Sequence, residues 1–197
     1  MKRKLTSHAL DRLFRSARTY RSWTSDALSE DKTREIYDLM KWGPTSANSC
    51  PARFVWVRSP QSKAKLAELA WDGNREKILA APLTAIIGYD LDFAKQLSKR
   101  LPHGPERIHE HFASAAVAEE NAARNGALQG AYLMMAARAL GLDCGPMSGF
   151  DNAAVDEAFF QGTRVKSNFI CSIGVGDPAS LHPRDPRLSF EDAGRFA

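Results

Sequence analysis

One long helical segment restricts the fold of this chain more than any other feature. Residues 116–140 form the longest stretch of the sequence that is expected to be a single helix. Gly141 can end it with a left-handed cap. A helix of this length beside strands predicts a class that mixes α and β elements. A surface of small residues favours close approach of another helix, and such residues crowd its middle: Ala122, Ala123, Gly126, Ala127, Gly130 and Ala131.

The other elements follow from periodicity and from helix-capping residues. Ser7, Ser29, Ser59 and Asp151 stand where helix caps are expected. Strands alternate with helices, and no repeat or linker interrupts them, so one domain over residues 1–197 is expected. Its arginine-rich tail, residues 177–197, cannot form a core alone and should wrap over something. Helices are expected at residues 7–18, 30–42, from 60 onward, 75–80, 116–140 and 151–160, and strands at 54–57, 83–89 and 169–175.

Composition excludes several classes of protein. The 197 residues carry a formal net charge of +4, which is too small to indicate nucleic-acid binding and which suits an anionic cofactor or substrate. Three cysteines without a C-x-x-C pair favour a reducing compartment, so a cytoplasmic location is expected. No apolar stretch can span a bilayer, so no membrane partner is expected. His109 and His111 stand two apart on a helix and face opposite ways, so no metal site is expected.

Three short segments carry candidate binding groups. Arg18, Thr19 and Arg21 combine guanidinium groups with a hydroxyl, which suits a phosphate. The alternative is an ordinary basic helix end. Residues 43–51 bracket hydroxyl and amide side chains between two prolines, so this loop can present them to a polar ligand. The alternative is a plain polar loop.

The third segment, residues 145–151, contains Gly149, where a flat ligand can approach the backbone. It leads directly to the helix expected after Asp151. The alternative is an ordinary connection between a helix and a strand.

Together with the tail, these segments resemble the nitroreductase family of FMN-dependent oxidoreductases. The likeness runs from about Arg18 to Phe190. The family's Pro-Ser-x-x-Asn-x-Gln-Pro-Trp loop is similar to residues 44–52, with Cys50 and Ala52 in place of glutamine and tryptophan. Its Pro-x-x-Gly-Phe segment is similar to residues 146–150, and its basic tail to residues 184–188.

The resemblance implies a fold and a cofactor. The fold is an α+β three-layer sandwich with a mixed central sheet flanked by helices. Two copies form a homodimer around the helix at 116–140, with FMN at the interface. Arg18 and Arg187 would hold the flavin phosphate, together with Thr19, Arg21 and Arg184.

The resemblance also assigns groups to the flavin ring. Asn74 matches a family asparagine at the pyrimidine edge, and Lys77 matches a basic position near N1 and O2. Backbone N–H groups of Ser148 and Gly149 would reach N5 and O4. The partner subunit would supply three residues of the loop: Thr45, Ser46 and Asn48.

The implied activity is hydride transfer from NADPH or NADH to a small molecule. The nucleotide and the acceptor would occupy the same site one after the other, which implies ping-pong kinetics. No side chain identifies itself as a catalytic acid. Residues 39–48, 139–151 and 186–191 are similar to the malonic semialdehyde reductase subgroup of pyrimidine degradation, which forms 3-hydroxypropanoate. Arg53 is a candidate partner for the substrate carboxylate. The alternatives are a general nitro or quinone reductase of the same fold and a non-catalytic flavin-binding module.

Overall fold

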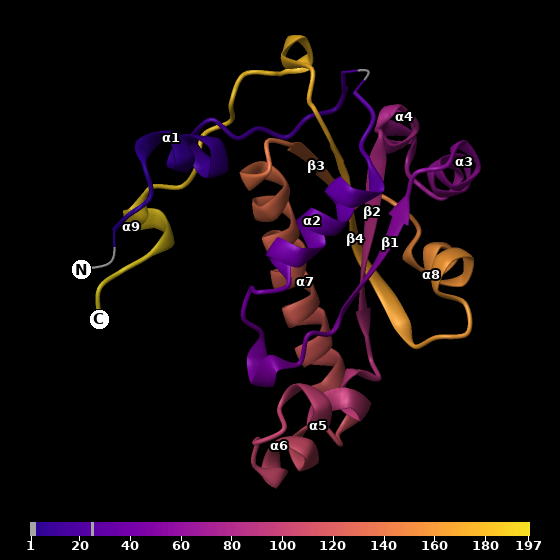
Figure 1. The fold of residues 1–197 in the computed structure, drawn as a ribbon, viewed down its shortest axis with the longest axis vertical. Coiled ribbons are helices and arrows are strands. Elements are labelled where there is room, and N and C mark those ends of the chain that lie inside the picture. The colour runs from indigo at the N-terminus through magenta and orange to yellow at the C-terminus, as the bar shows by residue number, and fades with distance from the viewer. Residues whose placement is uncertain (1–2, 25) are drawn as a thin grey trace.

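A four-stranded sheet runs through the middle of the protein (Figure 1). The computed structural model describes residues 3–24 and 26–197. The strand order is β1-β2-β4-β3, and each neighbouring pair is antiparallel. The strands are β1 (Ala52–Val57), β2 (Leu83–Asp90), β3 (Asp143–Met147) and β4 (Val165–Gly174).

The sheet corrects one expectation. A mixed sheet was expected, but parallel pairing within residues 3–24 and 26–197 is limited to the isolated bridge between Thr19 and Cys144. The connections between the strands explain the antiparallel pairing. The helical segment after β1 returns the chain so that β2 runs in the opposite direction to β1. Strand β4 lies between β2 and β3 and runs antiparallel to both.

Helices cover both faces of the sheet. The longest, α7, packs with α2 on one face, and α3, α4 and α8 lie on the other (Figure 1). The helices are α1 (Ser7–Leu10), a π-helical turn (Asp11–Arg15), α2 (Glu30–Met40), α3 (Pro60–Glu68), α4 (Asp72–Ala80), α5 (Leu97–Arg100), α6 (Glu106–His111), α7 (Ala115–Ala139), α8 (Asn152–Phe160) and α9 (Phe190–Ala193), with short 3-10 turns at Ser46–Asn48, Phe93–Gln96 and Pro178–Ser180.

Two apolar cores lie against the two faces of the sheet. Strand β2 contributes to both, because its side chains alternate between the faces. Ile87 packs in the core under α2 and α7, and Ile86 packs in the core under α3, α4 and α8. This arrangement confirms the expected three-layer sandwich.

The expected caps are confirmed for three helices. The side chains of Ser29, Ser59 and Asp151 each accept a backbone N–H of the first turn of α2, α3 and α8. The first helix differs, since Thr6 caps it in place of Ser7 and it changes to a π-helical turn after Leu10.

The glycines of α7 serve a different purpose from the expected one. A Cβ atom added at Gly126 would lie 2.9 Å from Cβ of Tyr89, and one added at Gly130 would lie 2.5 Å from the ring of Phe169. Tyr89 belongs to β2 and Phe169 to β4. These glycines therefore bring α7 close to the sheet, and not to a second helix.

The N-terminal segment and the tail lie beside each other, apart from the sheet (Figure 1). Arg184 Nη2 donates to the carbonyl oxygens of Arg15 at 3.0 Å and Ala17 at 2.7 Å. The tail therefore does wrap over another part of the chain. Its outer side stays open, with Leu188 75% exposed and Phe196 91% exposed. Over the described residues, no helix has both the length and the apolar character that a bilayer crossing needs.

Candidate functional site at the converging chain ends

Four arginines from the two ends of the chain, together with Arg138 of α7, surround one hollow. The hollow has a volume of about 330 Å3. This basic pocket is lined by Arg18, Arg21, Arg184 and Arg187, and its other residues include Thr19, Arg138, His182 and one acidic residue, Asp185. Within residues 3–24 and 26–197, none of these four arginines forms an ion pair with a carboxylate. The pocket therefore has an excess of positive charge that an anion can neutralise.

Backbone contacts fix the first side of the basic pocket. Tyr20 N donates to the carbonyl oxygen of Cys144 at 3.1 Å, so the segment after the first helix runs along the edge of β3. Gly145 permits this, because a Cβ atom there would lie 2.5 Å from the carbonyl oxygen of Tyr20. Arg18 Nη2 donates to the carbonyl oxygen of His182 and so ties the tail to this segment.

Lys77 and Asn74 form a second group, on α4. Lys77 Nζ donates to Asn74 Oδ1 at 2.9 Å, and Asn74 Nδ2 donates to the carbonyl oxygen of Gly149 at 3.0 Å. Burial lowers the pKa of Lys77, and the nearby charge of Arg21 lowers it further. The positive region of the basic pocket therefore continues through Arg21 to Lys77.

The backbone after β3 faces this second group. Of the described hydrogen bonds between backbone groups outside helices and strands, none has the N–H of Ser148 or Gly149 as its donor. A role of these two N–H groups in ligand binding stays a prediction from the resemblance.

The loop with Thr45, Ser46 and Asn48 lies elsewhere. Ser46 N donates to Asn125 Oδ1 of α7 at 2.8 Å, and Asn48 Nδ2 donates to the carbonyl oxygen of Arg100 at 2.8 Å. None of the three lines the basic pocket. Within one chain, the residues of the basic pocket therefore lie near the Asn74–Lys77 group, whereas this loop does not. Its supply by a partner subunit stays a prediction.

Arg53 does not provide a free cation. Its Nη2 forms an ion pair with Asp90 Oδ2 at 2.5 Å, and its Nη1 donates to the carbonyl oxygens of Cys50 and Ala52 at 3.2 and 2.9 Å. The guanidinium is thus committed to the turn before β1 and to β2. These contacts do not favour the expected contact with a substrate carboxylate, which stays a prediction.

His182 is a pocket residue that the sequence did not indicate. Its Nε2 lies 3.3 Å from Arg21 Nη1. A single histidine in a proline-rich tail gives no pattern that could have identified it. The side chain of His109 lies outside the described part of the chain, and no group of metal-ligating side chains is found in the part that is described.

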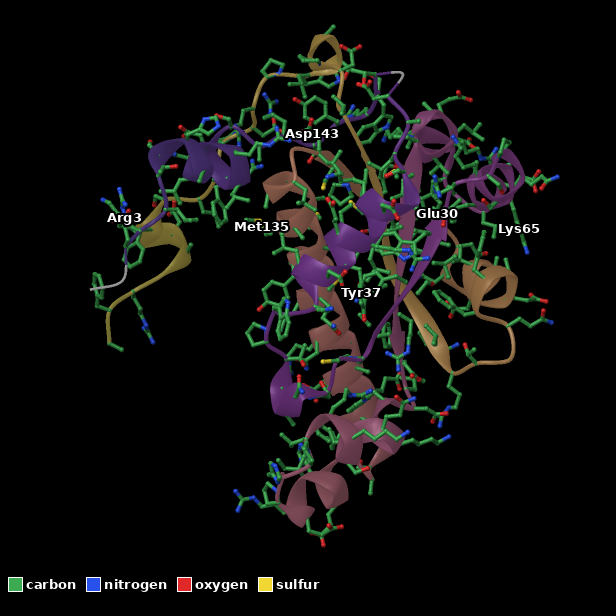
Figure 2. The ribbon with its side chains drawn as sticks, viewed as in Figure 1. Arg3, Glu30, Tyr37, Lys65, Met135 and Asp143 are labelled. Atoms are coloured by element: carbon green, nitrogen blue, oxygen red, sulfur yellow. The ribbon has the colours of Figure 1, made fainter. Side chains whose placement is uncertain are left out.

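A larger hollow, of about 610 Å3, lies beside α2 and β1. Glu30 and Tyr37, labelled in Figure 2, are among its lining residues. Arg58, also in its lining, forms an ion pair with Glu30 at 3.0 Å, and acidic Asp38 lines it as well. Its two acidic and two basic residues thus balance, whereas the basic pocket has five arginines and one acidic residue, Asp185.

The fold and the basic pocket define an α+β protein with a strongly basic hollow where its two chain ends meet. The sequence profile of the nitroreductase family matches residues 14–177, and the chain belongs to that family.

Known proteins agree with this assignment. A protein of Stenotrophomonas maltophilia (strain K279a), named provisionally as an NADH dehydrogenase/NAD(P)H nitroreductase, is 54% identical over the full length of both chains. Two solved structures of proteins provisionally described as nitroreductases share the fold. That from Bacillus subtilis has a TM-score of 0.84 at 20% identity, covering 98% of this chain and 100% of the other. That from Exiguobacterium sibiricum, in complex with FMN, has a TM-score of 0.82 at 21% identity, covering both chains fully.

Proposed function

We propose that this chain is an FMN-dependent NAD(P)H oxidoreductase that works as a homodimer of single-domain subunits in the cytoplasm. The observation that carries the proposal is the basic pocket, where Arg18, Arg21, Arg184 and Arg187 meet and form no ion pair with a carboxylate of residues 3–24 and 26–197. The FMN in the Exiguobacterium structure and the NAD(P)H in the name of the Stenotrophomonas relative support the choice of ligands.

The donor set of the basic pocket fits a phosphate group. A phosphate carries three terminal oxygens, and each guanidinium offers paired donors to such oxygens. Arg18 and Arg187 hold the phosphate in this proposal, with Arg21, Arg184 and the hydroxyl of Thr19 beside them. These residues orient the cofactor but take no part in the chemistry.

The Asn74–Lys77 group fits the pyrimidine end of a flavin. FMN, when bound, supplies hydride exchange at its N5 atom. Lys77 contributes a positive charge at the ring, and its hydrogen bond to Asn74 holds that charge in place. The N–H groups of Ser148 and Gly149, which donate to no backbone acceptor among the described bonds outside helices and strands, would donate to the ring edge.

The outer side of α7 fits a dimer interface. Ala127, Leu128 and Ala131 are exposed there, although Gly126 and Gly130 face the sheet. Met135, labelled in Figure 2, belongs to the same helix and borders an apolar groove with Leu39 of α2. In the proposed dimer this side meets a second copy, whose Thr45, Ser46 and Asn48 complete the flavin site.

Malonic semialdehyde is the proposed acceptor, reduced to 3-hydroxypropanoate. Support comes from the subgroup likeness of residues 39–48, 139–151 and 186–191. NAD(P)H and the acceptor use one site in turn, so initial-rate plots should be parallel lines. A general nitro or quinone reductase is the second candidate, because the relatives' names describe an NAD(P)H nitroreductase.

The test compares kcat/KM of the purified protein for malonic semialdehyde, propanal, a nitroarene and a quinone in one buffer. A preference of tenfold or more for the semialdehyde over propanal, on the order of 1.4 kcal/mol, supports the proposed acceptor. Equal values for the aldehydes with a much faster nitroarene or quinone support the second candidate. Bound FMN without any NAD(P)H turnover would indicate a flavin-binding module that is not an enzyme.

A further inference from the structure

Two buried amide side chains of α7 hold the ends of the loop at residues 45–52. Asn125 Oδ1 accepts a hydrogen bond from Ser46 N at 2.8 Å, and Gln129 Oε1 accepts one from Ala52 N at 2.8 Å. Asn125 is 2% exposed and Gln129 is 6% exposed. Four positions separate them, so they lie on one face of the helix, one turn apart. The two contacts therefore fix the entry and the exit of the same loop.

This loop has an unfavourable backbone conformation. Ala47, Asn48 and Cys50 have φ angles of +51°, +48° and +39°, in the left-handed region that residues with a side chain rarely adopt. Three such residues within four positions do not persist unless the surroundings hold them. The contacts from α7 lie at the two boundaries of this segment.

Most of the loop's own hydrogen bonds join its residues to one another, as in those from Asn48 N and Ser49 N to the carbonyl oxygens of Thr45 and Ser46 at 3.0 and 2.9 Å. Cys50 N donates to Thr45 Oγ1 at 3.1 Å, and Asn48 Nδ2 donates to the carbonyl oxygen of Arg100 at 2.8 Å. Removing the Gln129 amide would leave the N–H of Ala52, a buried residue, without an acceptor. The amides of α7 therefore connect both ends of the loop to the longest helix, and at its exit the N–H of Asp90 and Nη1 of Arg53 also donate to the carbonyl oxygens of Pro51 and Cys50.

We propose that Asn125 and Gln129 are positioning residues for the flavin. They hold the loop in its left-handed conformation, so that Thr45, Ser46 and Asn48 reach the flavin of the partner subunit. The inference rests on the proposed function, which assigns this loop to the flavin. Neither side chain needs to touch the ligand for this role.

Asn121 provides a matched control. It lies one turn before Asn125 on the same helix, is 9% exposed, and its Oδ1 has no hydrogen-bond partner in the described part of the chain. Asn121→Ala therefore removes a buried amide that holds no loop residue. The main-chain oxygen of Asn121, which accepts from Asn125 Nδ2 at 2.9 Å, remains in that variant.

The experiment uses full-length protein in four variants: Asn125→Ala, Asn125→Asp, Gln129→Met and Asn121→Ala. Hydrogen exchange by mass spectrometry follows the peptide over residues 44–52 in flavin-free protein. FMN dissociation constants and the visible absorption spectrum of bound FMN follow the ligand. We expect Asn125→Ala and Gln129→Met to speed loop exchange and weaken FMN binding by about tenfold each. Asn125→Asp keeps an acceptor oxygen, so its loop exchange rate and FMN affinity should be close to those of the wild type. Asn121→Ala should change neither the loop exchange rate nor the FMN affinity.

The loop exchange rates and the FMN affinities together test the inference. Loop exchange that stays at the wild-type rate in Asn125→Ala and Gln129→Met would overturn the inference. Faster exchange with unchanged FMN affinity would also overturn it, because the loop would then be held without serving the flavin. Wild-type protein that binds no FMN would overturn the proposed function instead, and the exchange rates would still show whether the amides hold the loop. If one variant fails to fold, the variant at the other position gives the same comparison.

Discussion

Arg187→Ala removes one guanidinium from the basic pocket without removing a contact between distant segments. The hydrogen bonds of Arg187 go to the carbonyl oxygens of Asp185 and Pro186, its own neighbours, at 2.9 and 3.1 Å. Arg18 and Arg184, in contrast, tie the tail to the N-terminal segment. The variant therefore tests ligand binding with little effect on the fold.

The expected loss of FMN binding free energy follows from the position of Arg187. A hydrogen bond to a charged group contributes about 1.5–3 kcal/mol, and solvent exposure of this side chain favours the lower end. A loss of about 1.5 kcal/mol weakens FMN binding roughly tenfold. Because the contact is electrostatic, the loss should shrink as salt concentration rises.

The assay is FMN titration of flavin-free protein at two salt concentrations. Arg195→Ala is the matched control, since it removes the same charge from the same tail outside the pocket. We expect a large loss for Arg187→Ala and almost none for Arg195→Ala. Equal losses in the two variants would show that only net charge matters, and unchanged affinity in Arg187→Ala would refute the phosphate assignment.

Three further predictions concern the fold, the dimer and Lys77. Gly130→Ala should destabilise the protein by about 1–3 kcal/mol in thermal unfolding, because its Cβ would lie 2.5 Å from the Phe169 ring. Gly73→Ala is the control, since no atom lies within 4 Å of a Cβ added there, and it should not destabilise the protein. Equal melting temperatures of the two variants would contradict the close packing at Gly130. Leu128→Glu, at an exposed position of α7, should convert the proposed dimer to monomer in light scattering, and an unchanged dimer mass would exclude this face as the interface. Lys77 has a lowered pKa in the folded chain, so flavin-free protein should gain stability as pH rises through that pKa toward the ordinary value of 10.5. Lys77→Met should abolish that gain in melting temperature and weaken FMN binding; an identical pH profile would disprove the argument.

Local signals predicted most of the helices. The caps at Ser29, Ser59 and Asp151 and the left-handed Gly141, at φ +86°, are properties of short segments, and the structure confirms them. Strand β3 was missed, because Gly145 and Pro146 are typical of turns. Its place at the edge of the sheet explains why a proline is tolerated there.

Long-range relations were harder to predict. The small residues of α7 indicated close packing but not the partner, since periodicity cannot distinguish a sheet from a helix as the neighbour of Gly126. The role of Arg53 depended on Asp90, a residue 37 positions away on another strand. The resemblance predicted the meeting of Arg18 and Arg187, which nothing in local sequence could have shown.

That meeting joins distant parts of the chain. The hydrogen bond from Arg18 to the His182 carbonyl spans 164 positions. Closing a loop of that length costs about 4–5 kcal/mol of chain entropy, and four like charges oppose it further. We therefore expect the basic pocket to form late in folding and to open first in flavin-free molecules. An anion bound there acts as a reversible cross-link, so the resistance of this polypeptide to proteases should follow the supply of its cofactor.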